Sequence, residues 1–328
     1  MITEQTTFQN IMDSALSHIV PCLVSGGQDM LKPEMTLQDL NNAQPTWNAA
    51  DMAAGLNRLN DLAERGTKLV YPVYSEADVE EDPTKAMVSL VHCPADGDAS
   101  DKPFILVIAG GAYGAVANIA EAFPVSAQWN ALGFTTFCLS YRVRIPNLFP
   151  KPLEDVHAAL QFIRAHAETF GVNPDRYLVS GYSAGGHITA CWGLDSIGCA
   201  HYGDPKPEAL FLAYPVVNFW DSMQATPEPI RGFMVGMTLS PDASAASAAP
   251  YNVDEQMTDA YPPFYHVQAL DDPTVPAWNA DRMETAAEAH GIRHKTERVP
   301  TGQHGFGAGT GTPAEGWTSR AIDFWKTL

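Results

Sequence analysis

Charge is scarce in this chain of 328 residues, and positive charge is the scarcer kind. Only 17% of the residues are charged, and 19 lysines and arginines stand against 38 aspartates and glutamates, for a net charge of −19. A surface with this balance repels phosphate backbones and anionic lipid headgroups. We therefore expect no nucleic-acid partner and no membrane partner, and a neutral small ligand fits better than a polyanionic one.

Long apolar runs are absent too. A membrane-spanning helix needs about 20 consecutive apolar residues, and no stretch of the sequence comes near that length. Residues 1–16 are polar and do not join a basic segment to an apolar one, as a secretory signal peptide does. These features favour a cytoplasmic location; a longer precursor that is secreted is the alternative.

Cysteine pairs and the common cofactor motifs are also missing. The five cysteines are odd in number, and no C-x-x-C sequence occurs. We expect buried free thiols in a reducing compartment. There is no H-E-x-x-H, EF-hand loop, Walker A or G-x-G-x-x-G sequence, so neither a metal nor another cofactor is expected.

The chain changes character near residue 66. Residues 1–66 contain amphipathic stretches and no strand-like run, and apolar residues in Asp51–Arg65 fall on one helical stripe that Gly66 is placed to end. We expect a helical N-terminal extension over 1–66, and one role open to it is to cap a functional site of the chain. A single larger domain is expected over 67–328.

From residue 67 on, strand-like and helix-like segments alternate. Two alternating segments, 69–74 and 86–92, predict an antiparallel start to a sheet. Continuous apolar runs, typical of strands buried on both faces, then occur at 104–109, 134–139, 177–179, 209–213 and 264–270. Helical patterns fall at 119–132, 152–170, 184–194, 277–290 and 313–328. This order predicts an α/β fold with a mostly parallel sheet and helices on both faces.

One segment, about 219–263, interrupts the alternation. It is rich in proline and contains a run of small residues at 243–249. A connection of this length without secondary structure is usually functional. We expect an insertion that folds over one end of the sheet, above a functional site.

The sequence Gly181-Tyr182-Ser183-Ala184-Gly185 matches the pattern G-x-S-x-G. The pattern is weak by itself, but here it follows an apolar strand and opens a helical stretch, which is the setting of a nucleophile elbow. The flanking glycines avoid collisions, and the serine projects beyond the carboxyl end of the sheet, where open α/β sheets bind ligands. Ser183 is therefore the predicted nucleophile; a tight turn that carries a serine by chance is the alternative.

A serine hydroxyl needs a base, and in this type of site the acid and then the histidine follow the serine along the chain. His304 lies on a glycine-rich loop, 302–307, between the last apolar strand and the final helical stretch. A histidine on such a loop can reach back over the sheet edge. We assign His304 as the base.

Other histidines fit this role less well. His290 and His294 flank a helix end and are expected to be solvated, and His266 lies within a strand and is expected in the core. His187 is one turn beyond Ser183 on the same helix, where packing or a supporting contact is expected.

Two candidate acids, Asp271 and Asp272, follow the strand at 264–270. Asp272 begins a D-x-x-V-P sequence that leads into a helix, and we assign it as the acid. Asp271 is the alternative, with backbone donors of a turn as its expected partners. In a Ser–His–Asp triad the histidine takes the serine proton, while the aspartate orients the imidazole and stabilises its charged form.

Backbone N–H groups for an oxyanion are expected at two places. One is Ala184, directly after the nucleophile, and the other is the loop after the strand at 104–109. That loop reads Ala109-Gly110-Gly111-Ala112-Tyr113, and its glycines let the backbone approach a ligand closely. We assign Gly111 and Ala112. A phosphate-binding turn is the alternative, but it lacks the Rossmann spacing and a basic neighbour.

With these motifs in this order, the chain resembles serine esterases of the α/β-hydrolase fold, above all the hormone-sensitive-lipase-like and acetyl-xylan-esterase-like (BD-FAE-like) groups. The resemblance covers about residue 103 to the C-terminus, and its most specific segments are 139–143 (LSYRV), 153–156 (LEDV), 173–176 (NPDR), 183–187 (SAGGH), 272–276 (DPTVP) and 304–306 (HGF). It implies a sheet of eight strands. The oxyanion loop departs from the pattern of both groups, because Ala109 replaces a histidine or proline and Ala112 replaces a third glycine.

The expected function is hydrolysis of carboxylic esters with short acyl groups through an acyl-enzyme on Ser183. Together with Ala112, Tyr113 and Tyr182 are expected to border the substrate pocket and to crowd a long acyl chain. The candidate substrates are O-acetyl groups of carbohydrates, small aryl or alkyl esters and short acylglycerols. A serine peptidase or amidase of the same fold is the main alternative, and a non-catalytic binding protein is the other.

Overall fold

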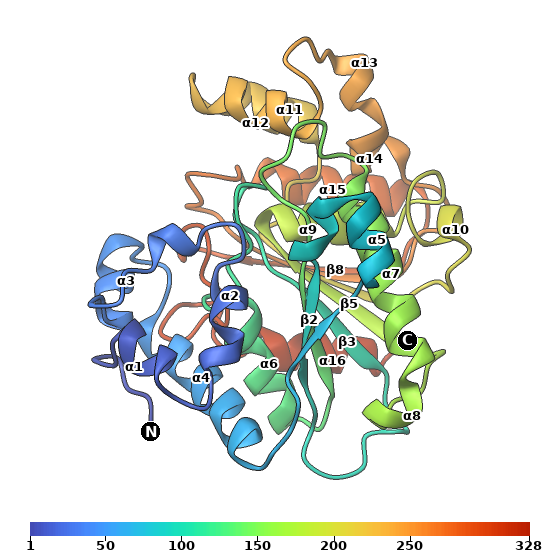
Figure 1. Ribbon diagram of the computed structural model, residues 1–328. Helices are drawn as coiled ribbons and strands as arrows, with labels where there is room; N and C mark the ends of the chain where they lie inside the picture. Colours follow the sequence, from blue (N-terminus) through green and yellow to red (C-terminus); the bar gives the residue numbers. More distant parts are fainter.

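The centre of the molecule is a sheet of eight strands (Figure 1), described here from a computed structural model of residues 1–328. The strand order is β1-β2-β4-β3-β5-β6-β7-β8. β2 is antiparallel to both neighbours, and every other pair of neighbours is parallel. The strands are β1 Val70–Pro72, β2 Ser89–Cys93, β3 Phe104–Ile108, β4 Thr136–Ser140, β5 Tyr177–Tyr182, β6 Leu210–Ala213, β7 Phe264–Ala269 and β8 His294–Val299. The predicted mostly parallel sheet with an antiparallel start is confirmed.

Helices cover both faces of this sheet (Figure 1). α6 and α16 pack together on one face, and α7 packs against α9 on the other. The helices are α1 Phe8–Met12, α2 Val20–Leu23, α3 Leu37–Ala43, α4 Ala49–Glu64, α5 Glu76–Glu81, α6 Ala122–Ala131, α7 Lys151–Ala165, α8 Ala167–Phe170, α9 Ser183–Trp192, α10 Cys199–Tyr202, α11 Phe219–Ala225, α12 Ile230–Thr238, α13 Ala245–Ala248, α14 Val253–Gln256, α15 Trp278–Ala289 and α16 Trp317–Trp325.

The parallel strands bring distant parts of the sequence to one edge of the sheet. The loop after β3 holds the candidate oxyanion donors, and Ser183 follows β5. Asp272 follows β7, and His304 follows β8. Because these strands are parallel, their carboxyl ends meet at the same edge, where ligands bind in open α/β sheets.

The eighth strand is the one that the apolar pattern did not locate. β8 reads HKTERV, lies at the edge of the sheet, and only Val299 in it is fully buried. Edge strands carry charged and polar residues on their open side, so no apolar run marks them. His294, expected to be solvated at a helix end, lies in this strand and is half-buried.

Two segments differ from the expected secondary structure. The helix expected over 152–170 is divided at His166 into α7 and α8. The interruption at 219–263 is largely helical, since it contains α11 to α14. Short helices separated by prolines are too brief to show a helical repeat of apolar residues, which explains why the pattern gave no sign of them.

The N-terminal extension shares the hydrophobic core of the sheet domain. α4 buries Met52 and Leu56 in that core, as its apolar stripe predicts. Gly55 allows α4 to approach α6 closely, because a Cβ there would lie 2.7 Å from the backbone of Phe123. Ser25 exchanges backbone hydrogen bonds of 3.1 and 2.9 Å with Val116, in the loop after β3. The extension therefore supports the segment that carries the candidate oxyanion donors.

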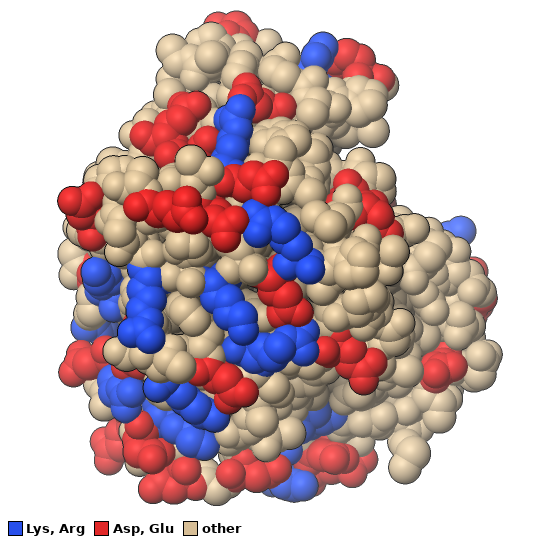
Figure 2. All heavy atoms as spheres, turned by 180° about the vertical axis from the view of Figure 1, so that it is seen from behind, with Lys and Arg blue, Asp and Glu red and all other residues tan.

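The remaining general features concern thiols, membranes and charge. All five cysteines are buried and none forms a disulfide. None of the helices combines the length and the apolar character that crossing a membrane requires. On the face seen in Figure 2, basic side chains lie among acidic ones and do not form a separate basic patch.

Candidate active site

Ser183 lies in the turn from β5 to α9 with a φ of 51°, a left-handed conformation that strains a residue with a side chain. Two glycines make room for this turn. A Cβ at Gly181 would overlap the carbonyl oxygen of Gly185, and a Cβ at Gly185 would overlap that of Ile108 in β3. The turn therefore packs directly against the sheet and has the geometry of the predicted nucleophile elbow.

His304 lies on the loop between β8 and α16 and directs its imidazole at Ser183. Its Nε2 is 2.8 Å from Ser183 Oγ. The Asp271 carboxylate holds this loop by accepting the Gln303 N–H at 2.8 Å. The ring of Tyr214 packs edge-on against the imidazole, with 5.0 Å between ring centroids. With its side chain only 16% exposed, His304 is fixed but still accessible.

Asp272 makes the contact with His304 that the sequence predicts for the acid. Its Oδ2 is 2.8 Å from His304 Nδ1, and its side chain is completely buried. Its Oδ1 accepts the N–H groups of Thr274 and Val275, both at 2.8 Å, and the Gln268 amide donates to Oδ2 at 3.2 Å. These donors compensate the cost of burying the carboxylate and fix its direction.

The contacts also determine which imidazole nitrogen carries the proton. A carboxylate only accepts, so His304 Nδ1 donates to Asp272, and in the neutral imidazole Nε2 is then bare. Nε2 can then accept the hydroxyl hydrogen of Ser183. Asp271 forms no hydrogen bond with His304; it accepts from a backbone donor, as expected of the alternative acid, although that donor belongs to the His304 loop.

The loop after β3 contains the other predicted donors. Gly111, Ala112 and Tyr113 have φ values of 134°, 52° and 59°. The N–H groups of Gly111 and Ala112 donate to no acceptor in the protein, and Ala112 and Ala184 line the same cavity as Ser183. Ala184 is in the first turn of α9, where the helix has no acceptor for its N–H. Free donors beside the nucleophile suit an oxyanion.

His187 supports this loop from below. Its Nε2 is 2.7 Å from the carbonyl oxygen of Tyr251, which only accepts, so Nδ1 is bare and accepts the Tyr113 hydroxyl at 2.5 Å. Burial lowers the pKa of His187 to about 4, which keeps it neutral. The supporting contact expected of His187 is therefore made to Tyr113, the neighbour of Ala112.

Tyr182 does not border the cavity, contrary to the expectation from the sequence. Its side chain is fully buried, with ring centroids 6.2 Å from Tyr214 and 6.0 Å from Trp317. Tyr182 is the last residue of β5, in which every residue is buried, and only the turn that begins at Ser183 leaves the core. Tyr113, the other expected pocket residue, does line the cavity.

The cavity at Ser183 has a volume of about 320 Å³ and mostly apolar walls. One wall is formed by the loop that follows Asp272, residues 273–276, and another by side chains of α11 and α12, among them Met223, Ile230 and Met234. The helical segment within 219–263 thus borders the nucleophile, where the insertion was expected.

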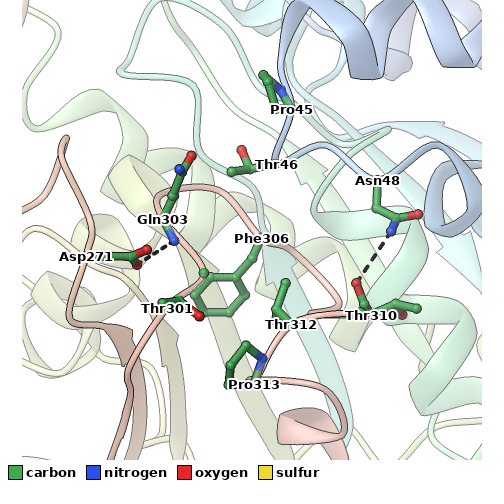
Figure 3. A pocket seen from close by; sticks show the side chains of 12 residues that line it. Pro45, Thr46, Asn48, Asp271, Thr301, Gln303, Phe306, Thr310, Thr312 and Pro313 are labelled. Atoms are coloured by element: carbon green, nitrogen blue, oxygen red, sulfur yellow. Dashed lines mark hydrogen bonds between the residues drawn. The ribbon is translucent and has the colours of Figure 1, made fainter.

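A second hollow, of about 360 Å³, lies where the N-terminal extension meets the His304 loop (Figure 3). Six uncharged polar side chains and one charged residue, Asp271, contribute to its lining, which consists of Pro45, Thr46, Asn48, Asp271, Thr301, Gly302, Gln303, Phe306, Thr310, Gly311, Thr312 and Pro313. At one side of it the Asn48 amide donates to the carbonyl of Thr310 at 3.4 Å. This polar hollow, defined by those twelve residues, differs in character from the apolar cavity at Ser183.

The extension also touches the residue after His304. A Cβ at Gly305 would lie 3.2 Å from Thr46 Oγ1 and 3.6 Å from Trp47 Nε1. Gly305 has a φ of 88°, which only glycine adopts easily. The segment around Thr46 and Trp47 therefore packs against the loop that positions His304.

Two buried polar residues beneath the site were not anticipated. Glu121 accepts the N–H of Gly110 and the hydroxyl of Tyr214. The only signal for Glu121 was a single acid inside the apolar stretch 119–125, and Tyr214 carried none. No group of three or more His, Cys, Asp or Glu side chains is arranged to hold a metal ion.

Comparison with known proteins assigns a family. The BD-FAE family profile matches residues 91–286, a range that includes Ser183 and Asp272 but not His304. The acetylxylan esterase of Xylanibacter ruminicola is 26% identical over 207 residues, which are 63% of this chain and 41% of that protein. Endo-1,4-beta-xylanase B of Butyrivibrio fibrisolvens is 25% identical over 239 residues, 68% of this chain and 35% of that protein. The chain thus spans less than half the length of these two relatives.

Solved structures share the fold. The acetyl ester-xyloside bifunctional hydrolase from Caldicellulosiruptor lactoaceticus aligns with a TM-score of 0.67 at 24% identity, over 79% of this chain and 95% of that one. A carbohydrate esterase from gut microbiota aligns with a TM-score of 0.63 at 16% identity, over 79% of this chain and 96% of that one. At such identities the likeness shows the α/β-hydrolase fold alone. Since the family profile covers more than half of the sequence, the chain belongs to the BD-FAE family of α/β-hydrolase esterases.

Proposed function

We propose that the chain is a serine carboxylic ester hydrolase in which Ser183 is the nucleophile, His304 the base and Asp272 the acid. The observation that carries the proposal is the unbroken line of contacts from Ser183 Oγ to His304 Nε2 and from His304 Nδ1 to Asp272 Oδ2, each 2.8 Å. The esterase family of the chain supports the same reaction class.

In the proposed reaction, His304 takes the hydroxyl proton as the Ser183 oxygen attacks the ester carbonyl carbon. The N–H groups of Gly111, Ala112 and Ala184 receive the resulting oxyanion. His304 then gives its proton to the leaving alcohol, and the acyl group stays on Ser183. The same histidine activates a water that attacks this acyl-enzyme and releases the acid and free Ser183.

The acyl group is proposed to be short and apolar. Ala112 and Ala184, the residues with the proposed donors, line the apolar cavity, so a carbonyl bound there places its acyl or alcohol group against the same walls. Tyr113 narrows this cavity and cannot swing away, because its hydroxyl is held by His187. A volume of about 320 Å³ lies at the lower end of the range for ligand pockets, which favours a short acyl chain.

The alcohol is proposed to be a neutral carbohydrate. Two observations favour this alcohol over an acylglycerol: the polar hollow beside the His304 loop, whose only charged lining residue is Asp271, and the relatives named as an acetylxylan esterase and a xylanase. Hydroxyl and amide side chains are suited to hydrogen bonding with sugar hydroxyls. The net charge of −19 also disfavours an anionic alcohol.

A substrate panel tests this proposal. We expect turnover of nitrophenyl acetate and butanoate, release of acetate from acetylated xylo-oligosaccharides, and no cleavage of an aminoacyl anilide. Anilide cleavage faster than ester cleavage would favour the peptidase or amidase alternative. Absence of any turnover would favour a binding protein.

One variant pair tests the alcohol separately. Thr301 is an exposed residue of the polar hollow, and Thr285 is an exposed residue of α15. We expect Thr301→Trp to lower the ratio of kcat/KM for the oligosaccharide to kcat/KM for nitrophenyl acetate by about tenfold, which corresponds to about 1.4 kcal/mol. Thr285→Trp should leave the ratio unchanged, and an equal ratio in both variants would place the sugar elsewhere.

A further inference from the structure

Glu121 is a carboxylate that the reaction above does not use, and it lies buried beneath the active site. It is 3% exposed and immediately precedes α6. A Cβ at Gly110 would lie 2.7 Å from the Cβ of Ser183 and 3.2 Å from Glu121 Oε2. The carboxylate is therefore separated from the nucleophile by little more than the Gly110 backbone.

Three hydrogen bonds connect the oxyanion loop to the His304 loop through this carboxylate. Glu121 Oε2 accepts the N–H of Gly110 at 2.6 Å. Glu121 Oε1 accepts the hydroxyl of Tyr214 at 3.0 Å, and the same hydroxyl oxygen accepts the N–H of Gly307 at 3.0 Å. Gly110 precedes the proposed donors Gly111 and Ala112, while Gly307 follows His304 by three residues.

The donors around Glu121 call for its ionised form. Gly110 and Gly307 can only donate through their backbone N–H groups, so the Tyr214 hydrogen is left to point at Glu121. An ionised carboxylate accepts from both sides, whereas protonation adds a hydrogen to this cluster and leaves one of its two O–H groups without an acceptor. Burial raises the pKa of Glu121, while the hydrogen bond from Gly110, the positive form of His304 and the Tyr214 hydroxyl counteract that rise.

We propose that Glu121 is a positioning residue for ester hydrolysis. It holds the oxyanion loop and the His304 loop in one register around Ser183, and its negative charge stabilises the imidazolium that His304 becomes during the reaction. The inference rests on the proposed function and deepens it.

Among the groups near His304, Asp272 and Glu121 are the two buried sources of negative charge. Asp272 contacts the imidazole from the loop after β7, and Ser183 from the start of α9. Tyr214, from the end of β6, packs on the imidazole and remains a neutral phenol, because burial raises its pKa well above the ordinary value. Asp271 accepts a backbone N–H of the same loop and is exposed, so solvent screens its charge.

The other titratable groups facing Glu121 are also neutral phenols. Tyr141 and Tyr182 are fully buried and lie near the carboxylate. Burial raises the pKa of each above the ordinary value. Glu121 and Asp272 are therefore the anions whose removal should alter the pH dependence of His304.

The test uses Glu121→Gln, which keeps the shape and removes the charge. Per active site titrated with a phosphonate, kcat is expected to fall about tenfold or more, with KM changed less than about threefold. The acid limb of the kcat/KM profile should move to lower pH by about half a unit, since loss of a nearby anion disfavours the imidazolium. Glu121→Asp should recover part of kcat.

Asp204→Asn is the matched control, because Asp204 is also a buried carboxylate. It is hydrogen-bonded to His157 at 2.7 Å and to Gln161 at 2.7 Å, away from the triad. This variant should lose stability and keep the wild-type pH profile. If Glu121→Gln also kept the wild-type kcat and pH profile, Glu121 would have only a structural role and the inference would be wrong.

Tyr214→Phe keeps the test decisive if Glu121→Gln does not fold. It breaks the link between the two loops but leaves the Glu121 charge, so kcat should fall with little change in the pH profile. A wild-type kcat in Tyr214→Phe would overturn the positioning role. Failure of the underlying function would look different, because the wild-type protein itself would then show no ester turnover.

Discussion

Asp271 and Asp272 are adjacent residues with the same side chain, yet the structure gives them different partners. Asp272 is buried and contacts His304 Nδ1 at 2.8 Å. Asp271 is exposed and accepts a backbone N–H from Gln303, also at 2.8 Å. One residue therefore acts on the imidazole itself, and the other on the loop that carries it.

This difference predicts unequal effects of two isosteric substitutions. Asp272→Asn should lower kcat by about 10³- to 10⁴-fold, because an amide favours the wrong imidazole tautomer. Asp271→Asn should lower kcat less than about tenfold and cost about 1 kcal/mol of stability, as expected for one weakened hydrogen bond. Steady-state kinetics at matched folded fraction decide the order, and the reverse ranking would make Asp271 the acid.

The three main site residues could be predicted individually because each depends on a local pattern. Ser183 is marked by a glycine-flanked turn between strand and helix, and Asp272 and His304 by their places after later strands. Their contacts agree with the predicted geometry, while their catalytic roles stay predictions. Glu121 and Tyr214 could not be predicted, since their significance lies in contacts across 93 positions of sequence that no local pattern records.

At the scale of elements, α12 is the helix whose role is easiest to test by substitution. Its residues Ile230 and Met234 line the cavity at Ser183, whereas Phe233, on the same helix, is 62% exposed and does not. α12 therefore offers neighbouring positions that do and do not line the cavity at Ser183.

Met234→Ala is predicted to improve the hydrolysis of esters with longer acyl chains relative to acetate esters. Removing the side chain enlarges an apolar wall, and one methylene in such a pocket is worth about tenfold or more in selectivity. The ratio of kcat/KM for nitrophenyl hexanoate to that for nitrophenyl acetate should rise about fivefold or more. Phe233→Ala should leave the ratio unchanged; an equal change in both variants would show that α12 acts through folding and not through the cavity.

Elements with continuous apolar character could be predicted, and those without it could not. The strands β3 to β7 are buried on both faces and appear as apolar runs, and α4 shows its stripe. β8 is a polar edge strand, and α11 to α14 are short helices between prolines. Both owe their structure to contacts with the rest of the fold, so their own sequences contain little signal.

At the scale of the whole molecule, buried histidines connect stability to pH. Burial lowers the pKa of His92 and His187 to about 4 and that of His266 to about 3, from an ordinary value of 6.5. Below pH 6.5 these histidines bind protons in the unfolded chain but not in the folded one. The free energy of unfolding therefore decreases as the pH falls from 6.5 toward 4. Buried Glu121 and Asp155, whose pKa values burial raises, oppose this loss in part.

His92→Phe is predicted to make the protein less sensitive to acid. His92 stacks on Phe137 with ring centroids 4.9 Å apart, and its Nε2 has no hydrogen-bond partner. A phenyl ring can take its place and does not titrate. The loss of stability between pH 7 and pH 5 should therefore be smaller by about 2 kcal/mol in the variant. Urea unfolding at both pH values measures this, with the exposed His201→Gln as control; an unchanged loss in His92→Phe would refute the prediction.

The fold of the whole molecule places Ser183 Oγ 2.8 Å from Nε2 of His304, a residue 121 positions later in the sequence. The most direct test of that arrangement is covalent labelling with a fluorophosphonate, followed by mass spectrometry of the peptides. We predict one label per chain, on Ser183, with loss of ester hydrolysis in proportion to labelling, and less than about a hundredth of wild-type turnover in folded Ser183→Ala. A label on another residue, or full activity in Ser183→Ala, would contradict the assignment of Ser183 as the nucleophile.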